Sequence, residues 1–312
     1  MHFLFAQGQS IWFCICHSLA AVYMFSDFMV NTLAHDATQN GYRYLLADTS
    51  ATQPVDISAR LRMKGLSVDL FTGERCNWRD CASPVLLELP SKSSDESDCL
   101  AAGNVLATWR FANCFTYIES PYEWNAVLAA LRVRTEAVLP GNVSVLLRYF
   151  DNRILPVLLQ TLSQDQRQTF LSLGTRWAIP GRHGELQQFE NSDASQQPAL
   201  GWPLQLDTAQ ETALIDAGEA DALNDVLLNQ DNPVLHAMSP PEQYERISEL
   251  LDNAKTMQIN QLSEQVAFCT LALELGTGFH EEPSWASHMQ EVRAGRLRFS
   301  EALGRITAEE ME

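Results

Sequence analysis

Short apolar runs alternate with helical patterns between Tyr42 and about Ile179. The runs are rich in β-branched and aromatic residues and predict strands. They are Tyr42–Ala47, Leu66–Phe71, Val85–Leu89, Cys114–Ile118 and Val143–Phe150. The last run, VSVLLRYF, is almost continuously apolar, which is typical of a strand buried on both faces. It therefore predicts a central strand.

Two helices are predicted between these strands. The sequence Ser120-Pro121-Tyr122-Glu123 has capping-box spacing, with Pro at the first helical position. The apolar residues that follow have the spacing of one buried helix face: Trp124, Val127, Leu128 and Leu131. A second helix is expected to begin at Ser163-Gln164-Asp165-Gln166 and to end at Gly174. Strands that alternate with helices predict an α/β-like lobe with a mixed sheet.

The pattern changes after residue 186. Gln187–Pro203 is polar and contains two prolines, which predicts a linker or a long surface loop. The rest of the chain is helical in pattern, with capping-box spacings at Thr208-x-x-Glu211 and Ser239-x-x-Glu242 and an end signal at Gly276. We therefore predict an α+β fold followed by an all-helical lobe. The expected segments are an extension (1–40), an α/β lobe (41–186), a linker (187–203) and a helical lobe (204–312).

The segment Ile11–Val30 is largely apolar. No Lys or Arg precedes Arg43, and four polar residues interrupt the run: His17, Ser18, Ser26 and Asp27. The segment therefore has neither the cationic start of a signal peptide nor the uninterrupted apolar length of a membrane span. It predicts either an amphipathic helix or an extension upstream of the natural start, for which Met24 and Met29 are candidates. We expect residues 1–23 to be dispensable and no membrane insertion.

The formal net charge is −18, which disfavours nucleic acid as a partner. From Leu204 onward there are 20 Asp and Glu against 6 Lys and Arg. This excess indicates either a solvated helical surface or a docking surface for a basic partner. The seven cysteines are scattered without a disulfide framework, which favours reduced thiols in a cytoplasm.

Candidate chemistry is sparse. Cys14-Ile15-Cys16-His17 cannot alone complete a tetrahedral zinc site, and Cys76 and Cys81 have no matching second pair. Cys114 and His183 could serve as nucleophile and base, but no local signature frames either residue. The phosphate-loop, nucleophile-elbow and zinc-helix motifs are absent. We expect no metal, no cofactor and no catalytic activity, with an unrecognised hydrolase or transferase as the alternative.

The run from Val143 to Ile179 resembles the effector-loading adaptor (chaperone) family of the type VI secretion system of Gram-negative bacteria. That family has a strand ending in Arg-aromatic-aromatic-Asp, often followed by Pro, then Arg-hydrophobic-Leu. The matching residues are Arg148, Tyr149, Phe150, Asp151, Arg153, Ile154 and Leu155, with Asn152 in place of the frequent Pro. Gly174 and Trp177 match the family's Gly-x-x-Trp strand. Tyr44–Asp48, Ser83–Leu89, Ser120-Pro121 and Leu273–Phe279 resemble further parts of the family pattern.

The resemblance implies a cytoplasmic, non-enzymatic adaptor. Such a protein binds a toxin effector, usually through the effector's N-terminal region, and loads it onto the valine-glycine-repeat (VgrG) spike protein. An acidic immunity-type inhibitor of a toxin is the alternative binding function. The residues Arg148, Tyr149, Asp151, Arg153 and Trp177 are the candidate structural or partner-binding residues. Arg148 or Arg153 could pair with Asp151 and fix the strand-to-helix turn, and the following helix begins either after an Asp151 cap or at Leu155.

Overall fold

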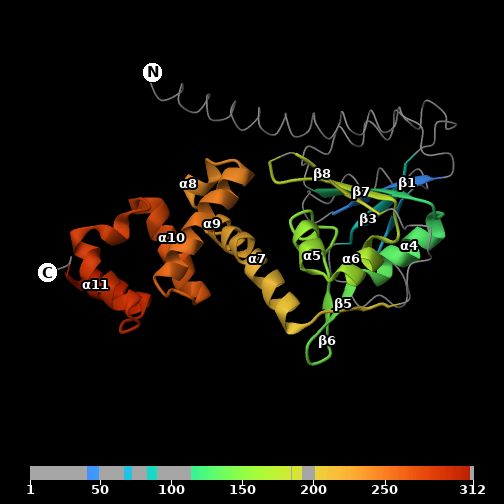
Figure 1. The fold of residues 1–312 in the computed structure, drawn as a ribbon. Coiled ribbons are helices and arrows are strands. Elements are labelled where there is room, and N and C mark those ends of the chain that lie inside the picture. The colour runs from blue at the N-terminus through green and yellow to red at the C-terminus, as the bar shows by residue number, and fades with distance from the viewer. Residues whose placement is uncertain are drawn as a thin grey trace, which may run out of the picture. The chain divides into compact units, whose positions relative to one another are not determined.

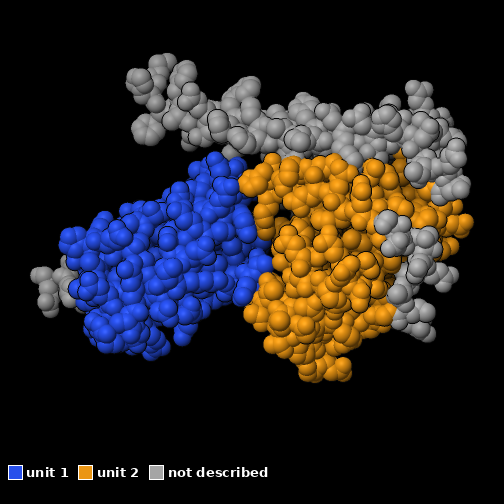
Figure 2. Space-filling model, in the orientation of Figure 1, with its two compact units in different colours: residues 1–14, 216–312 blue, residues 15–215 orange. Residues whose placement is uncertain are grey.

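The computed structural model describes residues 41–48, 67–71, 83–89, 114–183, 185–191 and 201–309. The N-terminal extension (1–40), Met24, Met29 and the cysteines at positions 14, 16, 76, 81 and 99 lie outside these residues. The described part divides between residues 215 and 216 into two compact units (Figure 2). The part up to residue 215 (orange in Figure 2), called the first unit below, consists of strands with short helices, and the part from residue 216 (blue), called the second unit, is helical (Figure 1). The predicted α+β fold followed by a helical lobe is confirmed.

The first unit contains two sheets. The larger one has the order β2-β3-β1-β4-β7-β8, and all of its pairings are antiparallel. The smaller one has the order β6-β5-β9, with β5 and β9 parallel. The larger sheet is formed by Tyr42–Ala47 (β1), Ser67–Asp69 (β2), Val85–Glu88 (β3), Phe115–Ser120 (β4), Arg176–Pro180 (β7) and Leu186–Glu190 (β8). The smaller one is formed by Glu136–Leu139 (β5), Val143–Leu146 (β6) and Leu204–Gln205 (β9).

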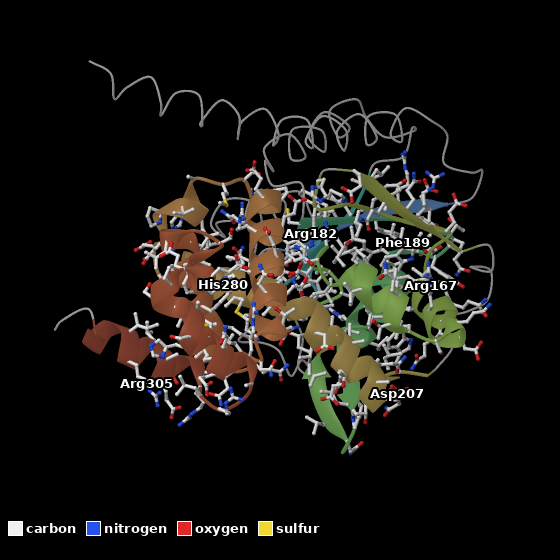
Figure 3. The ribbon with its side chains drawn as sticks, turned by 60° about the vertical axis from the view of Figure 1, so that its left-hand side comes forward. Arg167, Arg182, Phe189, Asp207, His280 and Arg305 are labelled. Atoms are coloured by element: carbon white, nitrogen blue, oxygen red, sulfur yellow. The ribbon has the colours of Figure 1, made fainter. Side chains whose placement is uncertain are left out.

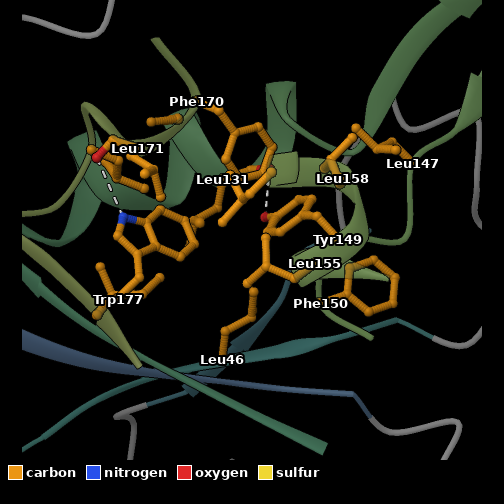
Figure 4. Close-up of a cluster of buried hydrophobic side chains, with 14 of the residues drawn as sticks. Leu46, Leu131, Leu147, Tyr149, Phe150, Leu155, Leu158, Phe170, Leu171 and Trp177 are labelled. Carbon is orange, nitrogen blue, oxygen red and sulfur yellow. Dashed lines mark hydrogen bonds between the residues drawn. The ribbon is translucent and has the colours of Figure 1, made fainter. Parts of the chain in front are cut away.

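Three helices pack on one face of the larger sheet: Trp124–Val133 (α4), Leu155–Thr161 (α5) and Gln164–Leu171 (α6). Alternate strand residues face these helices because successive side chains in a strand point to opposite faces. They form one core with the helices; its members from strands of the larger sheet are Tyr44, Leu46, Leu86, Ile118, Trp177 and Ile179. Figure 4 shows part of this core, in which Phe170 lies between the rings of Tyr149 and Trp177, 5.4 and 5.8 Å from them between centroids.

The second unit is built from helices around a separate core. They are the C-terminal part of Thr208–Leu228 (α7), Pro233–His236 (α8), Pro240–Thr256 (α9), Leu262–Leu275 (α10), the short 3₁₀ helix Phe279–Glu281 (η3), Pro283–Arg293 (α11) and Phe299–Glu309 (α12). The predicted capping box at Ser239 is confirmed, because the Glu242 carboxylate accepts hydrogen bonds from the Ser239 backbone N–H and hydroxyl. Gly276 ends α10 with a φ of 103°, a conformation that favours glycine.

Two predicted helix starts are wrong by one to three residues. Ser120 does not cap α4, which begins at Trp124. Its hydroxyl instead accepts from Tyr122 N–H and donates to the Leu173 carbonyl, so it joins the end of β4 to the chain before β7. At α7, the box is formed by Asp207 and Gln210, whose side chains each accept from the other's backbone N–H. Asp207 lies at the start of this helix (Figure 3). Its position is therefore one residue before Thr208.

The run Val143–Phe150 is not a central strand. Only its first half forms β6, at the edge of the smaller sheet, where Val143 is 54% exposed. The apolar character of the second half has another cause. Leu147, Tyr149 and Phe150 are buried in a turn that enters the main core. Apolar periodicity alone cannot distinguish a buried turn from a buried strand.

Gly174 follows α6 but does not cap it, since the helix ends at Leu171 with Ser172 at the cap position. A Cβ at position 174 would lie 2.7 Å from the Glu119 carbonyl oxygen and 2.9 Å from Ile118 Cγ2. The glycine is therefore required by the close approach of this turn to β4.

The expected linker, 187–203, includes most of β8, which pairs with β7. Residues 192–200 lie outside the described residues. The chain then returns to the first unit, where β9 pairs with β5. The two compact units meet within α7, between residues 215 and 216.

Candidate functional site

The site is the turn between β6 and α5, which carries most of the motif Arg148–Leu155. Asp151 is its central residue, with a side chain only 7% exposed. The carboxylate accepts hydrogen bonds from the Arg153 backbone N–H (3.0 Å), Nε (3.1 Å) and Nη2 (2.9 Å). Arg153 therefore binds both carboxylate oxygens, the geometry of a bidentate pair. The backbone carbonyl of Asp151 also accepts from Ile154 and Leu155 N–H, and α5 begins at Leu155.

Arg148 connects this turn to β1. Its Nη2 lies 3.0 Å from Asp48 Oδ2 and 3.9 Å from Asp151 Oδ2. The Arg148 guanidinium also lies over the Phe150 ring, 5.2 Å from its centroid. Asp48 is 3% exposed at the side chain. One partly exposed arginine thus neutralises charge on two buried carboxylates that are 103 positions apart, and the contact with Asp48 was not anticipated from the sequence.

Asn152 holds the same turn to β4. Its Nδ2 donates to the Phe115 carbonyl (2.9 Å), and its Oδ1 accepts from the Thr116 hydroxyl (3.3 Å). Asn152 therefore ties the turn to the larger sheet through its side chain.

The pKa of Asp151 is lowered. Burial acts to raise it, but the Arg153 hydrogen bonds and charge, together with the Arg148 charge, outweigh burial. Asp151 is thus ionised at neutral pH. The chemistry of the turn is that of a charged clamp, which joins β1, β4, β6 and α5 at one point.

The two aromatic candidates lie in the core. Tyr149 and Trp177 are completely buried. The Tyr149 hydroxyl donates to the Leu131 carbonyl (2.9 Å), and Trp177 Nε1 donates to the Leu171 carbonyl (3.3 Å) (Figure 4). Of the five candidate residues, only Arg148 and Arg153 have substantially exposed side chains, 30% and 39%. A partner protein could therefore contact the cluster through these two arginines.

Arg134 is a fully buried cation that no sequence pattern predicted. Arg134 is completely buried directly after α4. Its guanidinium donates to the carbonyls of Ala130, Thr169 and Phe170 and lies 4.8 Å from the centroid of Trp202. Burial lowers its pKa to about 10, so the group remains charged at neutral pH. It joins α4, α6 and the segment before β9. An arginine at a helix end ordinarily indicates a solvated position, so no local pattern pointed to this role.

The candidate nucleophile Cys114 is buried before β4. Burial and the Asp48 charge raise the pKa of its thiol to about 12, which keeps it protonated and weakly nucleophilic at neutral pH. His183 lies in the turn between β7 and β8, where its backbone N–H donates to Glu185 Oε2. The Gly181 N–H donates to the Glu185 carbonyl (2.7 Å), so Arg182 and His183 lie in a turn.

Within the described residues, no group of three or more His, Cys, Asp or Glu side chains could hold a metal ion. No helix in the same part of the chain is long and apolar enough to cross a membrane.

Comparison with known proteins gives one result for this chain. No curated protein and no solved structure matches it. Residues 43–169 match the model of a family described as "Domain of unknown function (DUF4123)". The match begins in β1 and ends in α6, and includes Asp48 and the whole Arg148–Arg153 turn. The chain therefore carries a DUF4123 domain in its first unit.

Proposed function

We propose that this protein is a non-enzymatic adaptor that binds a type VI secretion toxin effector and helps load it onto the VgrG spike protein. The observation that carries the proposal is the DUF4123 domain at residues 43–169, together with the resemblance of its Arg148–Leu155 motif to the effector-loading adaptors. The adaptor works in the cytoplasm, before secretion.

The geometry supports a binding role over a catalytic one. The motif residues are used to hold the fold together, through the Asp151 clamp and the buried rings of Tyr149 and Trp177. The high thiol pKa of Cys114 does not suit a nucleophile. These features favour a rigid scaffold whose surface is available to partners.

The test is reconstitution of the complex from three purified proteins. The full chain is mixed with a VgrG spike protein and a toxin encoded beside it, and the mixture is separated by size-exclusion chromatography. We expect a ternary complex, and we expect effector recovery with the spike to fall when the chain is omitted. Binding to the toxin alone, with loss of toxicity and no contact with the spike, would instead support an immunity-type inhibitor. Turnover of a substrate by the purified chain would support the enzyme alternative.

A further inference from the structure

The outer edge of β6 carries unpaired backbone groups. Its partner strand β5 lies between β6 and β9 in the smaller sheet. The Leu147 N–H donates to the Thr135 carbonyl on the side of β5. Because alternate residues of an antiparallel strand bond to the same neighbour, Val145 also faces β5, and the N–H and C=O groups of Ser144 and Leu146 point away from it. Within the described residues these four groups have no hydrogen-bond partner.

The same strand lacks the features that commonly protect a sheet edge, which are charged residues, Pro and bulges. Residues 143–146 read Val-Ser-Val-Leu and pair with β5 in an unbroken register. Val143 is 54% exposed, and Ser144 is also exposed. The hairpin of β5 and β6 projects from the first unit (Figure 1). The outer edge is therefore accessible to an added strand.

The other sheet edges in the described part of the chain are less suited. β2 has three residues, one of which is Asp69, and β8 contains Gln187, Gln188 and Glu190. β9 has two residues and directly follows Pro203. Charged residues and Pro at an edge disfavour the addition of a further strand. Among these four edge strands, β6 thus offers the edge that is uncharged and mostly apolar.

The edge determines the chemistry of its occupant. A row of unpaired N–H and C=O groups is satisfied together by another extended backbone. Glu136 of β5 is opposite Leu146, on the same face of the sheet, and is partly exposed. Its carboxylate has no hydrogen bond or ion pair among the described residues. A second copy of the chain would bring another formal charge of −18 and is disfavoured by repulsion, whereas a basic segment is attracted.

We propose that β6 is a docking edge, to which an extended segment of a partner protein adds as the fourth strand of the smaller sheet. The segment is apolar and contains at least one Lys or Arg. A basic residue opposite Leu146 would be about 10 Å from Glu136, or two strand spacings, which two long side chains can bridge. The proposal rests on the proposed function only for the identity of the partner. Its tests use a synthetic peptide, so their failure would leave the adaptor function standing.

The first test is amide hydrogen exchange, measured by NMR on the full chain with and without the peptide acetyl-Thr-Val-Lys-Val-Thr-Val-amide. When about nine-tenths of the chain is bound, exchange at Ser144 and Leu146 should slow about tenfold, because only the free fraction exchanges. The Val145 amide already faces β5 and should change much less. Equal protection at all three positions, or at none, would overturn the proposal. The same peptide with Glu in place of Lys should bind more weakly, and equal affinity would contradict a basic partner.

The second test removes one outward donor. Ser144→Pro deletes an N–H that points away from β5, and should weaken binding of the Lys peptide about three- to tenfold, as expected for the loss of one hydrogen bond. Gln188→Pro is the matched control, because the Gln188 N–H points away from β7 at the edge of the larger sheet. It should change the affinity by less than about twofold.

Thermal unfolding shows whether both Pro variants are folded. Unchanged affinity in a folded Ser144→Pro variant, or a larger loss in Gln188→Pro, would contradict the proposal. Self-association of the wild type that Ser144→Pro abolishes would assign the edge to a second copy and would also overturn it. If Ser144→Pro does not fold, the alternation of amide protection in the wild type decides.

Discussion

Replacing Asp151 by Asn tests whether the motif turn is a structural clamp. The substitution keeps the size of the side chain but removes its charge. In the folded protein the carboxylate is 7% exposed and accepts three hydrogen bonds from Arg153. The amide can accept only at its single oxygen, so the bidentate pair is lost.

The magnitude follows from the exposure of the partners. Removing one member of a fully buried ion pair costs about 3–5 kcal/mol, mostly because the remaining charge is left without solvation. Here Arg148 and Arg153 are 30% and 39% exposed and can be hydrated after the change. We therefore expect a smaller loss, about 2–3 kcal/mol in the free energy of unfolding at pH 7.

The stability lost in Asp151→Asn should become smaller as the pH falls. The folded-state pKa of Asp151 is lowered, so its contribution is present above the unfolded value of about 3.9 and is lost as the pH falls through the folded value. The difference between wild type and Asp151→Asn should stay constant from pH 7 to pH 5 and shrink below about pH 4.

The assay is urea unfolding of both proteins, with co-purification of the effector measured on the same samples. Asp252→Asn, at an exposed position on α9, is the control and should change stability by less than about 0.5 kcal/mol. A variant as stable as wild type would refute the clamp. If that variant also bound less effector, the turn would be a contact surface, with Arg148 and Arg153 as its exposed residues.

Three further predictions concern the first unit. Arg134→Lys should lower the free energy of unfolding, measured in urea, by about 2 kcal/mol, because an ammonium cannot reproduce the planar guanidinium that binds three carbonyls. A Lys variant as stable as the wild type would contradict this account. Gly174→Ala should lower the free energy of unfolding by at least about 2 kcal/mol, because the added Cβ would meet the Glu119 carbonyl. The control Gly218→Ala, in α7, has free space for the Cβ and should raise that free energy by about 0.5–1 kcal/mol. Equal effects of the two substitutions in thermal unfolding would refute the packing argument. Limited proteolysis should cut the chain between Glu190 and Gly201. The two fragments should still elute together under native conditions, because β9 pairs with β5 and Trp202 contacts Arg134. Separate elution of the fragments would refute this prediction.

The sequence predicted much of the fold because local signals agree with tertiary structure in most elements. The run Tyr42–Ala47 is β1 residue for residue, and α9 follows the capping box predicted at Ser239. The failures have tertiary causes. Val143–Phe150 is apolar because Tyr149 and Phe150 enter the core through a turn, which periodicity cannot distinguish from a strand.

The candidate site was predicted only in its local part. Pairing of Asp151 with Arg153 is a contact across two positions and could be named from the motif. The contacts of Asp48 with Arg148, and of Asn152 with Phe115 and Thr116, join residues distant in sequence, and no local pattern specifies them. Arg134 was missed because a helix-terminal arginine is normally solvated.

The family match and the folded unit do not end at the same residue. The match stops at residue 169, inside α6, whereas two strands of the larger sheet, β7 and β8, and the last strand of the smaller one, β9, follow it. A protein cut at the match would lose both Phe170, which packs against Tyr149, and Trp177, and would expose the β4 edge that β7 pairs with. The family match is thus shorter than the compact unit whose two sheets it contributes to. Fragments for expression, domain exchange or fusion should extend through β9.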